Sequence, residues 1–219
     1  MGSISKRSFC IFSGLSGIVG VVLLIASFHA AVGPPASATA AEGVKFGEQH
    51  YAAILWGAWL QAVGPVLIVL FAFALVHLAG AALRLSGWMT FLGATILMIV
   101  SLIEITFYIS ALFPDPPVMP LVSIKFIYAV QHLYFIVAAP ALFLPLGIVL
   151  ISSRILPRLF GYLALALAAT FAGLGVAFLL TLRLPDAVTA FAGVQGLWWL
   201  AAGITLVARS GRIAKMQSE

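Results

Sequence analysis

Residues 51–78 read YAAILWGAWLQAVGPVLIVLFAFALVHL, a run without Lys, Arg, Asp or Glu. A helix rises about 1.5 Å per residue, so about 20 apolar residues cross a hydrocarbon layer of about 30 Å. Backbone N–H and C=O groups in lipid must bond within their own segment, which makes such a run helical. Residues 51–78 therefore predict a transmembrane helix and set the fold class.

The composition of the whole chain agrees with this interpretation. Of 219 residues, 63% are hydrophobic and only 8% are charged. A soluble domain needs a polar surface around its core, and this chain has too few polar residues to supply one. We therefore expect an all-α protein, a polytopic bundle of transmembrane helices with the lipid bilayer as its partner.

Apolar runs between charges and Pro or Gly breaks predict six transmembrane helices in one integral membrane domain, residues 1–219. The expected spans are 9–32, 51–78, 87–113, 121–151, 158–182 and 188–208. The longest connection, residues 33–49, is rich in Ala, Ser and Thr and is expected to be an irregular or partly ordered surface loop. Residues 209–219 form a short basic tail.

The distribution of Lys and Arg between the connections predicts the orientation. The group expected in the cytoplasm is Lys6, Arg7, Arg84, Arg154, Arg158, Arg209, Arg212 and Lys215, and the opposing group is Lys45, Lys125 and Arg183. Positive residues concentrate on the cytoplasmic side of a membrane protein. We therefore expect a multi-pass protein of the plasma (inner) membrane with both termini in the cytoplasm.

The first span has a second interpretation as a signal peptide. Lys6 and Arg7, the apolar stretch after them and the small residues Ala38-Thr39-Ala40 resemble its three regions. The apolar run extends over about 20 residues, whereas the apolar core of a signal peptide has about 7–15. An uncleaved first helix is the expectation, and cleavage after Ala40 remains the alternative.

Several partners and cofactors find no support in the sequence. The net charge of +5 comes from loops and tails, so it indicates topology rather than a nucleic-acid partner. Cys10 is the single cysteine, and no His or acidic pair has the spacing of a helical metal site. His132 lies deeper than His29 and His50, which argues against a haem held by two histidines. We expect no metal, no cofactor and no catalytic residue that can be assigned.

Four polar side chains on four helices are predicted to share one depth near the middle of the bilayer. Counted from the outer surface at about 1.5 Å per residue, Glu104 lies about 14 Å deep, Gln61 about 15 Å, His132 about 16 Å and Gln195 about 10 Å. A carboxylate at this depth costs about 2.5–3.5 kcal/mol, so Glu104 should be protonated, partnered or facing a cavity. We expect it to face the interior and to meet His132.

Further polar residues extend this layer. Ser101 and Tyr108 share the face of Glu104 at helical spacing, and Lys125, Tyr128 and His132 form a stripe that leads inward from the outer surface. The candidate binding residues are Glu104, His132, Gln61, Tyr108, Tyr128 and Gln195.

The polar layer has two interpretations. As structural contacts, the four side chains hold the helices together, each bond worth about 0.5–2 kcal/mol. As a functional site, Glu104 and His132 form a pair whose protonation changes near neutral pH.

Small residues and tryptophans predict how the helices pack. Ser13, Ser16, Gly17 and Gly20 line one face of the first span, and Ala164, Ala168 and Ala172 line one face of the fifth, beside Gly161 and Gly173. Such faces let helices approach closely. The tryptophans lie partly near the predicted membrane interfaces, where an aromatic belt accounts for them: Trp56, Trp59, Trp88, Trp198 and Trp199.

The segment from Gln131-His132-Leu133-Tyr134 through Pro145-Leu146-Gly147 to the turn Leu156-Pro157-Arg158-Leu159-Phe160-Gly161 resembles a bacterial family of six-helix membrane proteins of unknown function. In that family a similar Leu-Pro-Arg-x-x-Gly turn opens the fifth helix. The resemblance implies the six-helix topology and transfers no activity or site residue.

Three classes of function fit the sequence. The expected one is a binding or transport protein with a polar pocket around Glu104 and His132, which takes a proton or a small hydrophobic ligand. The alternatives are a structural or accessory subunit, with a second copy or another membrane subunit as partner, and an intramembrane enzyme that uses Glu104 and His132 as acid and base. Enzymes bring together more polar groups than this chain offers, which disfavours the last.

Overall fold

The computed structural model describes residues 5–30, 33–34, 38–113, 115–178 and 186–216, and all regular elements in these ranges are helices. Arg183 and the end of the fifth predicted span lie outside them. The helices are α1 (Lys6–Ala30), α2 (Ala40–Gln49), α3 (Tyr51–Leu78), α4 (Leu85–Ser110), α5 (Met119–Leu133), the π-helix η1 (Tyr134–Ala138), α6 (Ala139–Ser152), α7 (Arg158–Phe178), α8 (Asp186–Ala208) and α9 (Ser210–Met216).

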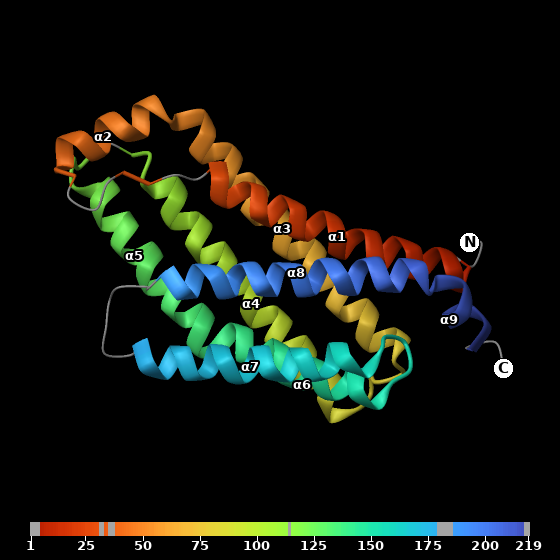
Figure 1. Ribbon diagram of the computed structural model, residues 1–219. Helices are drawn as coiled ribbons and strands as arrows, with labels where there is room; N and C mark the ends of the chain where they lie inside the picture. The colour runs from red at the N-terminus through yellow and green to blue at the C-terminus, as the bar shows by residue number, and fades with distance from the viewer. Residues whose placement is uncertain (1–4, 31–32, 35–37, 114, 179–185, 217–219) are drawn as a thin grey trace.

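Five of the described helical segments are long and apolar enough to cross a membrane. They are α1, α3, α4, the continuous rod α5–η1–α6 and α7, at the positions of the first five predicted spans. In α8 the apolar segment Gly193–Ala208 is shorter. A bundle of apolar helices is therefore confirmed. In this bundle α1 packs on α3 and α8, while α6 packs on α4 and α7 (Figure 1).

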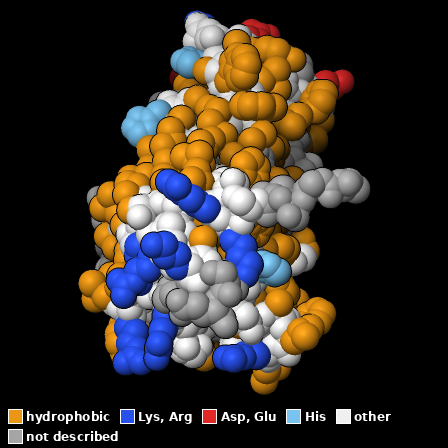
Figure 2. Space-filling view, turned by 90° about the vertical axis from the view of Figure 1, so that its right-hand side faces the viewer, with side chains coloured by type: hydrophobic (Ala, Val, Ile, Leu, Met, Phe, Trp, Pro, Cys, Tyr) orange, Lys and Arg blue, Asp and Glu red, His pale blue; other side chains and the backbone are white. Residues whose placement is uncertain are grey.

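The two chain ends and the two short basic turns lie at the same end of the bundle. Figure 1 shows both termini beside the α3–α4 and α6–α7 turns, with α2 at the opposite end. Figure 2 looks at the first end and shows Lys and Arg side chains gathered over it. Arg209 also donates from Nη2 to the carbonyl oxygen of Arg154 at 3.4 Å, which ties the end of α8 to the α6–α7 turn.

Within residues 33–49, the expected irregular or partly ordered loop, residues 40–49 form the helix α2. Thr39 and Glu42 make a capping box: the Thr39 hydroxyl accepts from the Glu42 N–H at 3.3 Å, and Glu42 Oε2 accepts from the Thr39 N–H at 2.7 Å. These bonds satisfy backbone donors that a helix start leaves open. The N–H and hydroxyl of Thr39 also lower the pKa of Glu42, because they stabilise its charged form.

A single proline explains why the long rod from α5 to α6 contains a π-helix. Pro140 has no N–H, and in an α-helix its ring would clash with the carbonyl of Ile136, four residues earlier. Here the turn before it widens, and the N–H of Ala139 bonds to the carbonyl of Tyr134, five residues earlier. The wider turn places one extra residue between the faces of α5 and α6.

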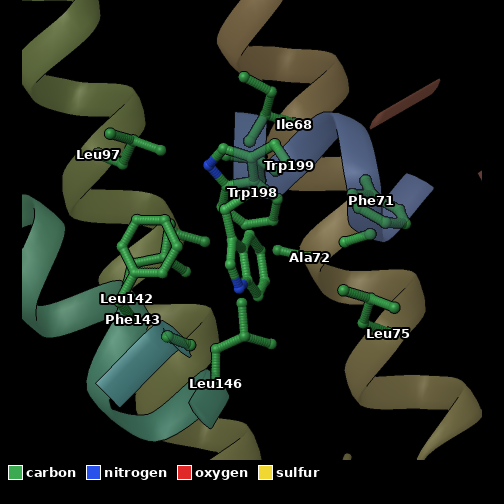
Figure 3. Packing of buried hydrophobic residues seen from close by; sticks show 14 of the residues in the cluster. Ile68, Phe71, Ala72, Leu75, Leu97, Leu142, Phe143, Leu146, Trp198 and Trp199 are labelled. Carbon is green, nitrogen blue, oxygen red and sulfur yellow. The ribbon is translucent and has the colours of Figure 1, made fainter. Parts of the chain in front are cut away.

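The apolar core lies between α3, α4, α6 and α8, as Figure 3 shows for Phe71, Leu97, Phe143 and the tryptophan pair. Trp198 and Trp199 are buried here, in the middle of α8. Trp198 donates from Nε1 to the carbonyl of Phe160 at 3.0 Å, which binds α8 to α7. The belt interpretation fits the other three, since Trp56, Trp59 and Trp88 are exposed.

Pairs of glycines bring backbones together at the helix crossings. A Cβ on Gly20 would meet the carbonyl oxygen of Gly64 at 2.8 Å, and a Cβ on Gly64 would meet that of Gly20 at 2.9 Å. Gly147 and Gly161 are related in the same way between α6 and α7. The small residues of α1 are buried as expected, whereas Gly173 of α7 has open space beside it.

We expect Gly93→Ala to destabilise the bundle, because its Cβ would overlap the carbonyl oxygen of Ala141 in α6. Overpacking of this kind costs about 1–3 kcal/mol. Gly173→Ala is the matched control, since nothing lies within 4 Å of its Cβ and alanine favours a helix by about 0.5–1 kcal/mol. Thermal unfolding in detergent measures both, and equal midpoints for the two variants would contradict the close α4–α6 crossing.

Candidate functional site

Glu104 is the only acidic residue within the five candidate membrane spans. It lies in the last two turns of α4 and is buried, with 9% of its surface exposed. An apolar helix gains nothing by placing a carboxyl group there unless neighbouring helices provide polar partners. The surroundings of Glu104 are therefore the starting point for a functional site.

Two amides from two other helices donate to the Glu104 carboxyl group. Gln61 of α3 donates from Nε2 to Oε2 at 2.6 Å, and Gln131 of α5 donates from Nε2 to Oε1 at 3.0 Å. Each carboxyl oxygen thus has one uncharged donor. The cluster joins three consecutive helices, which is the arrangement expected for a buried polar group in a helical bundle.

Contacts on either side hold these side chains in register. On α4, Ser101 donates from Oγ to the backbone carbonyl oxygen of Gln61 at 3.3 Å. Nearer the C-terminal end of α4, the hydroxyls of Ser110 and Ser123 are 2.7 Å apart, and the rings of Phe107 and Phe126 stack with centroids 4.9 Å apart. These contacts fix α4 against α3 and α5, so that both amides reach the carboxyl group.

A second polar contact lies beside the first and brings in α8. The hydroxyl of Tyr134, at the start of η1, donates to Oε1 of Gln195. Tyr134 follows Gln131 by three residues, so the two side chains share a face of the rod. Tyr108 of α4 and Tyr134 both lie close enough to Glu104 to interact with it electrostatically. The polar layer therefore involves α3, α4, the α5–η1 rod and α8.

One amide oxygen of this cluster is without a partner. Only 2% of the surface of Gln61 is exposed. Its Oε1 has no hydrogen-bond donor in the described structure. Buried polar atoms are nearly always bonded, so an exception calls for an explanation.

The predicted residues divide into two sets in the structure. Glu104 and Gln61 are bonded directly, and Gln195 and Tyr108 lie in the same layer. Tyr128 is 45% exposed, and the Nδ1 of His132 hydrogen-bonds the backbone carbonyl oxygen of Tyr128 at 2.8 Å. The pairing of Glu104 with His132 stays a prediction.

Gln131 and Tyr134 are the residues that sequence reasoning missed. Both belong to the same polar stretch as His132, and Gln131 follows Tyr128 at helical spacing of three residues. From Tyr128, a spacing of three residues leads to Gln131 and Tyr134, whereas the spacing of four that the prediction used leads to His132. Tyr134 gave a further signal, because a buried tyrosine hydroxyl needs a hydrogen-bond partner.

The described residues contain no group of three or more His, Cys, Asp or Glu side chains that could hold a metal ion. The Nδ1 atoms of His29 and His50 hydrogen-bond carbonyl oxygens one turn earlier in their own chain, those of Ile25 and Phe46, each at 3.0 Å. His50 also stacks on Phe46 with ring centroids 4.1 Å apart. The described chemistry of the site is thus that of one carboxyl group among amides, hydroxyls and aromatic rings.

No protein-family model, curated protein or solved structure matches this chain. Its function must therefore be inferred from the polar layer itself.

We expect Glu104 and Gln61 to be energetically coupled. In a double-mutant cycle with Glu104→Leu and Gln61→Leu, the double variant should lose about 0.5–2 kcal/mol less than the sum of the single losses, because each single change leaves a buried partner unbonded. The same cycle with Gln131→Leu should give a smaller coupling, since its bond is longer and less buried. Denaturant unfolding measures all variants, and additive losses in the Gln61 cycle would contradict the bond.

Proposed function

We propose that the chain is a six-helix protein of the plasma (inner) membrane with both termini in the cytoplasm. α8 supplies the sixth span, because its 23 residues suffice for the hydrocarbon layer. The gathering of Lys and Arg at the end that holds both termini and both short turns supports the orientation.

Cysteine labelling in intact cells tests this topology. Gly33 and Gly211 both have open space for a side chain, and they belong to opposite predicted sides. A membrane-impermeant maleimide should label Gly33→Cys, and should label Gly211→Cys only after the cells are opened. The parent chain is the control, because Cys10 is buried. Labelling of Gly211→Cys in intact cells would overturn the proposed orientation.

We infer that this membrane protein binds or transports a small molecule with the gain or loss of a proton at Glu104. The observation that carries this proposal is a buried carboxyl group whose hydrogen-bond donors, Gln61 and Gln131, are both uncharged. Ionisable groups inside a membrane are costly and mark ion, proton or substrate pathways in membrane proteins. If the cluster only held the helices together, a glutamine in place of Glu104 would serve equally well.

The amide partners suit a group that changes its protonation. A primary amide carries two N–H donors and one carbonyl acceptor, so it can bond a carboxylate through its nitrogen and a carboxylic acid through its oxygen. Gln61 can therefore stay bonded to Glu104 in both states by rotating its amide. The aromatic side chains around the layer, among them Phe107, Phe126 and Tyr134, favour a small hydrophobic molecule as ligand.

The rod of α5 provides a polar route from the outer surface to the site. Lys125 and Tyr128 are exposed on α5, and Gln131 follows with its amide on Glu104. The three residues are spaced three apart along the helix, so they drift only gradually around its surface. A proton or a small ligand that enters from outside would meet these groups in turn.

Infrared difference spectroscopy between acidic and alkaline buffer tests whether Glu104 exchanges its proton with water. We expect a carboxyl band that appears on acidification in the parent protein and is missing in Glu104→Gln. The amide replacement retains the shape and hydrogen bonding of Glu104 but cannot titrate, so it should remain folded. Glu42→Gln is the control, since this exposed carboxyl lies outside the spans and its loss should leave the Glu104 band in place.

A Glu104 band that is the same in both buffers would show that the carboxyl group is sealed from water. Together with near-neutral stability of Glu104→Gln, that result would make the cluster an interhelical contact, as expected of a structural or accessory subunit.

A further inference from the structure

We propose that Glu104 and Gln61 together hold a small monovalent cation, with Na⁺ as the test ion, in competition with the proton. This inference rests on the proposed function, because it assigns a second occupant to the same carboxyl group. The argument is carried by the balance of hydrogen-bond donors and acceptors around that group.

The cluster offers more acceptors than donors. An ionised carboxylate has about four lone-pair positions, and the structure fills one on each oxygen, from Gln61 and from Gln131. The buried Oε1 of Gln61 adds an acceptor with no donor at all. A surplus of buried acceptors is satisfied either by a proton or by a cation that binds oxygen.

The unpartnered oxygen lies within reach of the carboxylate. Oε1 and Nε2 of Gln61 share one carbon at bond lengths of about 1.2 and 1.3 Å, so they are separated by less than about 2.6 Å. Nε2 lies 2.6 Å from Oε2 of Glu104. The distance between the unpartnered Oε1 and the carboxylate is therefore at most about 5 Å. Two metal–oxygen bonds of about 2.3–2.6 Å span up to about 5 Å, so one small cation beside the amide nitrogen can contact both oxygens.

The charge and type of the ligands select a monovalent hard cation. Carboxylate and amide oxygens suit hard ions, whereas soft metals prefer sulfur and nitrogen. One carboxylate among amides neutralises one positive charge, and a divalent ion would leave an excess charge in an apolar bundle. Ser101 adds a hydroxyl oxygen one turn before Glu104, on the helix surface that faces Gln61.

Other titratable groups near the site set the conditions of the test. They are Tyr108 on α4, Tyr134 on η1, and Tyr128 and His132 on α5. From α3 and α8 the neighbouring polar groups are the amides of Gln61 and Gln195, which do not titrate. A comparison of Glu104→Gln with the parent at each pH therefore separates the contribution of Glu104 from that of the phenols and the imidazole.

Thermal unfolding of the purified full-length protein tests the proposal, with NaCl, LiCl, KCl or choline chloride at one ionic strength. In alkaline buffer Na⁺ should raise the melting temperature above that in choline, because binding to the folded state stabilises it. The shift should disappear in acid, where the proton occupies Glu104, and in Glu104→Gln at any pH. Line broadening of the sodium NMR signal provides a direct measurement of binding.

Gln61 and Gln131 form a matched pair of variants. Gln61→Leu removes the unpartnered oxygen, so its apparent affinity for Na⁺ should fall by about tenfold or more. Gln131→Leu removes a donor but no ligand, so the Na⁺ response should persist. Gln61→Met keeps the length of the side chain and serves if Gln61→Leu does not fold. An equal loss in both leucine variants would overturn the role assigned to Gln61.

The outcomes separate this inference from the proposed function. If acid changes the Glu104 carboxyl band while Na⁺ and choline give the same melting temperature and the same sodium line width, the cation site is overturned and the proton site stands. If neither acid nor Na⁺ acts through Glu104, both proposals fail.

Discussion

Close approach of helix backbones is the constraint on which the rest of this structure depends. Lipid chains are as apolar as leucine, so helices in a bilayer associate through packing and hydrogen bonds rather than by leaving water. Here glycines meet glycines where α1 crosses α3 and where α6 crosses α7. Such crossings leave little freedom in the distance between the helices. Between α3 and α4 a hydrogen bond marks the approach, since the Gln61 amide donates directly to the Glu104 carboxyl group.

The close approach of the helices also explains why the polar side chains of the layer contact one another directly. Gln61 and Gln131 each contact Glu104 directly through their side chains, and serine and aromatic contacts nearer the C-terminal end of α4 hold α4 and α5 in register. A looser bundle would require water or longer side chains to make the same links. Chemistry that depends on one carboxyl group benefits from this rigidity, because its partners are held in place.

Much of the architecture can be read from the sequence, because the hydrocarbon thickness sets the length of a span. The range predicted for α3 agrees with the structure, and those of α1, α4 and the α5–α6 rod differ by a few residues at their ends. α2 was missed because its composition was given more weight than the capping box of Thr39 and Glu42. The burial of Trp198 and Trp199 in the core could not be predicted, because tryptophan suits both an interface and a core position.

The sequence predicts how far along its helix each polar side chain lies, but not the direction in which that side chain points around the helix axis. Counting residues gives the height of a side chain in the bilayer, so Glu104, Gln61 and Gln195 were assigned to one layer. Which way a residue points depends on the rotation of its helix, and neighbouring residues differ by about 100°. Gln131 and His132 are such neighbours, and it is Gln131 whose amide donates to Glu104. The unpartnered oxygen of Gln61 depends on atomic packing that no pattern of residue types contains.

The π-helix at Tyr134–Ala138 makes the α5–α6 rod two helices with different rotational settings. One added residue turns everything beyond it by about 100°, so the face that carries Gln131 and the face that packs on α7 need not follow one helical wheel. The α5 half of the rod can therefore present Gln131 to Glu104 of α4, while the α6 half packs apolar side chains against α4 and α7. Deleting a single residue within this turn would remove the extra rotation and set the two halves out of phase with their partners.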